Sequence, residues 1–221
     1  MDGVGHGLSM LSPLSKVKPL DSSAERGNTR FPDSLQRRLA VKQTSRMNER
    51  LSYEDSFRFL QREGWEGEGD VPPIPERPPA YEDEELGLSF FRSWVNEAKM
   101  EHLTIPRTYF SRSTVSKTSF ANTDLTESVA NWNDFEDVNF STANLTRFDF
   151  RGCVLRRIQF REAILAEADL RFCTFEDCNF QNADLMGAKI TREAGKSLVL
   201  STEQETQIAW QEDDGPEPGG G

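Results

Sequence analysis

Histidines, cysteines and long apolar runs are scarce in this sequence, and each shortage excludes a class of protein. The two histidines, His6 and His102, are too far apart to suggest a metal centre. Three cysteines in 221 residues do not suggest the disulfide framework of a secreted domain. No stretch reaches the roughly 18 apolar residues needed to span a bilayer, and the first twenty residues lack the features of a signal peptide. We therefore expect a cytoplasmic protein without a metal, a cofactor or a contact with a membrane.

Hydrophobic residues are also few, which limits the size of the folded core. They make up 36% of the chain, while charged residues make up 29%. At this composition a single core cannot be shared by the whole chain, so we expect a compact part and a part that remains solvated. The net charge is −11, and much of it lies in residues 63–85, which contain nine acidic residues and one basic residue.

This acidic segment is also rich in proline and glycine, a composition typical of an extended linker. The stretch from Pro72 to Pro79 favours a polyproline helix, and Pro78-Pro79-Ala80-Tyr81 matches a short motif that WW domains bind. For such a composition we favour the simpler interpretation of a stiff, solvated spacer.

A period of five residues begins near residue 101. Every fifth position from Ile105 to Ile190 is apolar, which makes eighteen positions without an exception. In most blocks a small residue lies two positions earlier, and an amide or an acid often lies between the two. Because a fixed internal period is the signature of a repeat architecture, residues 101–190 are expected to form stacked coils. The clearest copies are Ala143-Asn144-Leu145, Ala168-Asp169-Leu170 and Ala183-Asp184-Leu185.

Over residues 101–190 this motif resembles the pentapeptide-repeat family. The resemblance implies an all-β solenoid, a right-handed quadrilateral β-helix with one pentapeptide on each side and four in each coil. Eighteen blocks then make about four and a half coils, in which the large and the small residue of each block point inward. Cys153, Cys173 and Cys178 all occupy the small position, which favours a role in the core over metal binding or redox chemistry.

Four blocks in each coil predict that residues 20 positions apart stack and share chemistry. Phenylalanine recurs at positions 120, 140, 160 and 180. On the third side the outward charges change sign from coil to coil, so we expect ion pairs between neighbouring coils. These charges are Lys117, then Glu136 and Asp137, then Arg156 and Arg157, then Glu176 and Asp177.

Three residues depart from the repeat pattern. Phe148 and Ile158 place bulk where a small residue is usual, and Ala130 leaves its column thin. We therefore expect local bulging near the second and third coils.

A solenoid leaves unpaired backbone groups at both ends, so caps are expected. Apolar residues between Leu86 and Ala98 approximate helical spacing, and Ser201 with Gln204 forms a capping-box start for a helix that carries Ile208 and Trp210. A weak amphipathic stretch that starts at Ser52 is too sparse to count on as a domain. The predicted organisation is a mostly disordered tail with the linker over residues 1–84, a capping helix over 85–100, the solenoid over 101–190, a C-terminal cap helix over 191–212 and a disordered tail over 213–221.

The second side of the solenoid is the strongest candidate for binding a partner. Trp132 and Phe172 are predicted to point outward two coils apart, with arginines and aspartates beside them. Exposed aromatic residues next to arginine are typical of interface hot spots. Isolated surface aromatics or contacts with a cap are an equally good explanation. The candidate partner-binding face consists of Trp132, Asp149, Arg151, Asp169, Arg171 and Phe172.

No spacing typical of a nucleophile elbow, a phosphate loop or a metalloprotease is present, so an enzyme is not expected. The resemblance implies a non-catalytic protein-protein interaction module, such as an immunity protein that neutralises a bacterial toxin, or a targeting scaffold. The alternative is a DNA mimic that binds a topoisomerase such as gyrase and confers quinolone resistance. Residues 101–190 contain ten basic and thirteen acidic residues, a small excess of negative charge that favours the interaction module. A homodimer is compatible with either function, and direct binding to nucleic acid is not expected.

Overall fold

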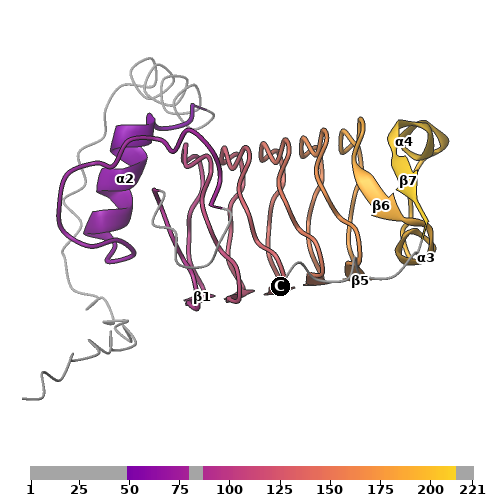
Figure 1. Cartoon of the computed structure of the whole chain (residues 1–221), viewed down its shortest axis with the longest axis horizontal. Coiled ribbons are helices and arrows are strands. Elements are labelled where there is room, and N and C mark those ends of the chain that lie inside the picture. Colours follow the sequence, from indigo (N-terminus) through magenta and orange to yellow (C-terminus); the bar gives the residue numbers. More distant parts are fainter. Residues whose placement is uncertain (1–48, 80–86, 213–221) are drawn as a thin grey trace, which may run out of the picture. The chain divides into compact units, whose positions relative to one another are not determined.

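The computed structural model describes residues 49–79 and 87–212, and its main feature is a four-sided β-solenoid (Figure 1). One side is a parallel sheet of five short strands in chain order, in which each strand pairs with the residues 20 positions further on, as Val95 does with Val115. Isolated bridges with the same offset connect the coils along the other three sides. The predicted stack of four pentapeptides in each coil is therefore confirmed. The strands are β1 (Trp94–Asn96), β2 (Thr114–Ser116), β3 (Asp134–Glu136), β4 (Val154–Arg156) and β5 (Thr174–Glu176).

Each corner of the solenoid depends on one residue with a left-handed backbone. These residues recur every five positions, from Arg92 with a φ of 51° to Asn182 with a φ of 56°, and only Gly152 and Gly187 in this series are glycines. A left-handed conformation costs a residue with a side chain about 1 to 2 kcal/mol. Hydrogen bonds to the next coil offset this cost, as when the N–H of Asn122 donates to the carbonyl of Ser141 at 3.0 Å.

The core consists of columns of stacked side chains, as the repeat predicts. Ring centroids are 5.3 Å apart between Phe120 and Phe140, 5.5 Å between Phe140 and Phe160, and 4.8 Å between Phe160 and Phe180. All four rings are buried. The amide beside this column also continues between coils, because Asn179 donates to the side-chain oxygen of Gln159 at 3.1 Å.

The small inward residues bind backbone carbonyls that lie within the coils. In the early coils they include hydroxyls, such as Thr123 Oγ1, which donates to the Met100 carbonyl at 2.6 Å. In the later coils the thiols of Cys153 and Cys173 take this position and contact the carbonyls of Ala130 and Phe150 at 2.7 and 3.0 Å. The predicted core role of the cysteines is thereby confirmed.

The solenoid begins earlier than the sequence predicts, and the capping helix expected over 85–100 is not formed. Residues 88–100 make up the first coil, in which Phe90, Val95 and Met100 are buried and continue the five-residue period. The apolar residues of this stretch fit both a helical period and a period of five. Pairing with the second coil favours the period of five. With the extra coil at this end and a modified one at the other, the solenoid has about six coils instead of four and a half.

The N-terminal cap is helix α2 (Tyr53–Arg62), within the region that was expected to be mostly disordered. Ser52 caps this helix by accepting a hydrogen bond from the N–H of Asp55 at 3.1 Å. The helix buries Phe57 and Leu60 as part of the solenoid core. Ser56 Oγ accepts a hydrogen bond from the N–H of Thr104 at 2.8 Å, so the helix also binds the first coil through its polar groups.

The C-terminal end is a last coil in which two sides are helical: α3 (Arg192–Gly195) and α4 (Thr202–Gln207). Strand β7 (Ala209–Gln211) then pairs with β6 (Lys189–Thr191), again with an offset of 20 residues. The predicted capping box of Ser201 and Gln204 is present. Ile208 and Trp210 follow helix α4 instead of lying on it. The tail from residue 213 lies outside the described residues.

The bulging expected near Phe148 and Ala130 does not occur. The ladder continues there, since the N–H of Asp169 donates to the Phe148 carbonyl at 2.9 Å. The Phe148 ring stacks on Phe150 at 3.9 Å and lies 6.5 Å from Phe110. Phe110 and Phe150 are the neighbours of Ala130 in its column, so Phe148 fills the volume that the small alanine leaves. Two departures from the repeat therefore compensate each other.

Candidate protein-binding surface

The predicted partner-binding residues lie on one corner of the solenoid and on the side next to it. Trp132 and Phe172 occupy the left-handed corner position, with φ angles of 57° and 60°. Asp149 and Asp169 pair through a β-bridge along the centre of the adjoining side. The structure thus brings together the residues that the sequence analysis grouped.

Each aspartate on this side holds an arginine two residues further along the chain. Arg151 Nε and Nη2 donate to the two carboxylate oxygens of Asp149 at 2.9 and 2.7 Å. Arg171 binds Asp169 in the same way, at 2.9 and 2.8 Å. The hydrogen bond from Asp169 raises the pKa of the Arg171 guanidinium above its ordinary value. These clamps fix the arginines along the surface and balance their charge, so this corner differs from the continuous basic patch that nucleic acid attracts.

Trp132 is the exposed centre of this corner, and a glycine in the next coil makes room for it. Its side chain is 66% exposed, while its N–H donates to the Arg151 carbonyl at 3.0 Å. A Cβ atom at Gly152 would lie 2.6 Å from the Trp132 ring, so the ring lies directly against this glycine. Phe172 is half-buried in the coil beyond. The sequence analysis missed Gly152, although it stacks 20 residues after Trp132.

A second exposed tryptophan lies on the strand side that starts from the same corner. Trp94, in β1, is 85% exposed. The sequence analysis placed it on a capping helix, and its position in the repeat became visible only with the first coil. The two tryptophans give the solenoid large apolar groups on both sides of one corner column.

The other charged columns are paired between coils. On the predicted column, Arg156 Nε binds Glu176 at 2.9 Å, and Arg157 binds Asp137 at 2.6 Å and also Glu136. The expected alternation of charge is therefore confirmed. A second alternating column passes through Arg107, Glu127, Arg147 and Glu167, where both arginines bind Glu127. The sequence analysis did not identify it, although the same spacing of 20 residues reveals it.

The repeats match a sequence model of one family, described as pentapeptide repeats, with eight copies over residues 134–157 and 153–192. The chain is a pentapeptide-repeat protein. No curated protein matches its sequence.

Several solved structures resemble this pentapeptide-repeat protein. The pentapeptide repeat protein Rfr23 from the cyanobacterium Cyanothece 51142 is 12% identical, with 48% of this chain and 85% of that chain covered and a TM-score of 0.46. A pentapeptide repeat protein from the Arabidopsis thaliana thylakoid lumen is 20% identical, with 51% and 72% covered and a TM-score of 0.29. QnrB1, a plasmid-mediated fluoroquinolone resistance protein, is 10% identical, with 65% and 88% covered and a TM-score of 0.22.

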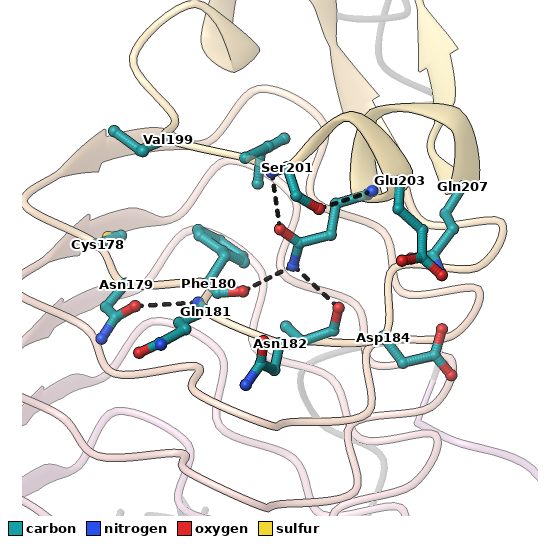
Figure 2. Close-up of a pocket in the computed structure, with 13 residues that line it drawn as sticks. Cys178, Asn179, Phe180, Gln181, Asn182, Asp184, Val199, Ser201, Glu203 and Gln207 are labelled. Carbon is teal, nitrogen blue, oxygen red and sulfur yellow. Dashed lines mark hydrogen bonds between the residues drawn. The ribbon is translucent and has the colours of Figure 1, made fainter.

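This pentapeptide-repeat protein also has a groove of about 810 Å³ where helix α4 meets the last regular coil (Figure 2). The Gln204 amide spans it and donates to the carbonyls of Phe180 and Ala183 at 2.7 and 3.0 Å. Cys178 also lines the groove, and burial raises the pKa of its thiol, which makes it a poor nucleophile. The polar groups of the groove therefore serve to close the solenoid. Within residues 49–79 and 87–212, no helix is long and apolar enough to cross a membrane.

Proposed function

We propose that this pentapeptide-repeat protein is a non-catalytic protein-protein interaction module that binds its partner through the corner around Trp132. The observation that carries the proposal is the exposed indole packed on Gly152, with arginine-aspartate clamps beside it. Tryptophan and arginine are enriched among the residues that contribute most to binding, because a large flat ring buries much apolar area when a partner covers it. Trp94 extends the apolar surface onto the neighbouring side.

The solenoid suits this role because it presents the corner on a rigid frame. The backbone of each corner is bonded to the coils on both sides, as the N–H of Trp132 and the N–H of Gly152 both donate to the next coil. The clamped arginines lose little further freedom when a partner arrives. Binding therefore needs little rearrangement of this surface.

The charge pattern favours an ordinary protein partner over a topoisomerase that recognises a DNA-like surface. A DNA mimic needs continuous acidic rows, whereas two corner columns of this solenoid alternate in sign and are paired between coils. Such pairing weakens the long-range field that would attract a DNA-binding protein. Neutralisation of a toxin and recruitment by a scaffold both agree with this surface, and formation of a homodimer through the same corner would be a special case.

The experiment is an affinity capture from the native host with the full chain and two variants. Trp132→Ala is expected to weaken binding of the captured partner by at least about 2 kcal/mol, which is about 30-fold in Kd. The control is Met186→Ala, which removes a side chain that is 57% exposed but lies outside the corner. A partner that binds both variants equally well would refute the assignment of this surface. Inhibition of gyrase supercoiling by the purified protein would instead support the DNA-mimic function.

A further inference from the structure

The segment between helix α2 and the first coil has a restricted backbone. Its sequence over residues 71–77 is Val-Pro-Pro-Ile-Pro-Glu-Arg. Each proline fixes its own φ near −65°, and the residue before each proline is confined to extended or polyproline conformations. Every residue from Val71 to Pro75 is either a proline or the neighbour before one, so a polyproline II helix is the conformation that the sequence favours here.

Such a helix has three residues per turn, and the burial of this segment follows that period. Pro75 is buried, and Pro72 and Pro78, three residues on either side of it, are half-buried. On another edge of the helix, Ile74 is 46% exposed and Arg77 is exposed. One edge therefore lies against the protein while a second edge, with a large apolar residue and a cation, faces solvent.

Two contacts hold the buried edge against the solenoid. The Pro75 carbonyl accepts a hydrogen bond from Arg107 Nη1. The Pro75 ring also lies so close to Gly87 that a Cβ there would be 2.8 Å from Pro75 Cγ. Arg107 is itself held by Glu127 at 2.7 Å, as part of the second alternating column. The segment is thus attached to the first coil at one proline and one arginine.

We propose that residues 71–77 are a binding site for a protein module with an aromatic-lined polyproline groove of the SH3 type, and that the solenoid masks this site. The order of residues is the one that such a groove accepts: an apolar residue and a proline, a spacer, a second apolar residue and a proline, a spacer, and a cation. The pairs Val71-Pro72 and Ile74-Pro75 fit the two aromatic pockets, and Arg77 fits an acidic pocket beside them. This chemistry accounts for the exposed Ile74, which the fold leaves unexplained.

Masking follows from the edges that the module must contact. Both apolar-proline pairs and the cation enter the groove, so the edge that carries Pro72 and Pro75 has to leave the first coil. The apparent affinity of the full chain is then reduced by the fraction of molecules in which the segment is released. The neighbouring match to a WW motif ends in Ala80 and Tyr81, which lie outside the described residues.

The test measures the binding of a purified SH3 domain that prefers this order of residues, by calorimetry, to the full chain and to a synthetic peptide of residues 68–79. We expect the peptide to bind at least about tenfold more tightly than the full chain. Arg107→Ala in the full chain removes the donor to Pro75 and is expected to recover at least about threefold in affinity. The control is Arg147→Ala, which breaks the other bond to Glu127 but leaves Pro75 untouched, and it is expected to change nothing.

Substitutions in the peptide identify the residues that are recognised. Arg77→Glu and Pro72→Ala are expected to abolish binding, whereas Pro73→Ala, at a spacer position, is expected to preserve it. A peptide that fails to bind, or that binds equally well with Arg77→Glu, would overturn the binding site. Equal affinity of the peptide and the full chain would overturn the masking. Circular dichroism of both arginine variants shows whether the solenoid is retained, and a peptide of residues 68–85 that binds only a WW domain would also contradict the proposal.

Discussion

Exchanging Ala130 and Phe148 tests whether the core is specified by total volume or by the column in which each side chain stands. The Phe148 ring lies between the two neighbours of Ala130, at 3.9 Å from Phe150 and 6.5 Å from Phe110. We expect Phe148→Ala alone to lower the free energy of unfolding by about 3 to 5 kcal/mol, because the cavity forms at a fully buried site. Ala130→Phe alone is expected to cost about 1 to 3 kcal/mol, because the new ring has no room beside Phe148.

The double variant conserves the composition and the volume of the core. A phenylalanine at 130 would complete a column with Phe110 and Phe150, as Phe140 does between Phe120 and Phe160 at 5.3 and 5.5 Å. The double variant should therefore be more stable than the sum of the single effects predicts, by at least about 2 kcal/mol.

Urea unfolding of the four proteins, followed by circular dichroism, gives the coupling energy from the double-mutant cycle. Ile158→Val, a smaller change at another buried position of the solenoid core, controls for general softening and is expected to cost about 0.5 to 1.5 kcal/mol. Single effects that add to within about 0.5 kcal/mol would show that the two sites are independent and would refute the compensation.

Three further predictions concern the backbone and the caps. Gly152→Ala should destabilise the protein by more than Gly187→Ala, because both glycines have a φ of 70° but only the first is pressed against the tryptophan ring; equal losses in urea unfolding would contradict this. Gln204→Ala leaves two carbonyls of the last coil without donors and should cost about 1 to 3 kcal/mol, with faster hydrogen exchange confined to the C-terminal end; unchanged exchange there would contradict it. Burial raises the pKa of Glu66 from 4.5 to about 7, so its contribution to the stability of the N-terminal cap is fully present below about pH 4.5 and is lost as the pH rises through 7; hydrogen exchange of helix α2, corrected for the intrinsic rate, should show this loss in the native protein but not in Glu66→Gln.

The sequence predicted the solenoid well because its period is written in the residues themselves. Stacking every twentieth residue placed Phe120 above Phe140 and Arg157 beside Asp137 without any knowledge of the backbone. The same rule was sufficient to find the column through Arg107 and Glu127, which was overlooked because only one corner was examined for alternating charge. The rule applies wherever neighbouring coils repeat the same chemistry.

The two ends were harder to predict, because there the repeat is degenerate or absent. Residues from Leu88 to Ala98 satisfy a helical period as well as a period of five, and only hydrogen bonds to the second coil distinguish them. Helix α2 carries few apolar residues, so its stability depends on Phe57 and Leu60 packing against a coil that follows some 30 residues later. Such contacts between distant segments cannot be inferred from a local pattern. The exposed Trp94 was misplaced for the same reason.

The alternating charge columns restrict how the length of this protein can change during evolution. Duplication of one coil adds 20 residues and preserves every core column, since phenylalanine still stacks on phenylalanine. The same duplication places like charges in contact on two corners, where Arg157 now binds Asp137 and Arg107 binds Glu127. Duplication of two coils restores the opposite signs. Growth of this solenoid is therefore compatible with its surface in steps of 40 residues, although its interior permits steps of 20.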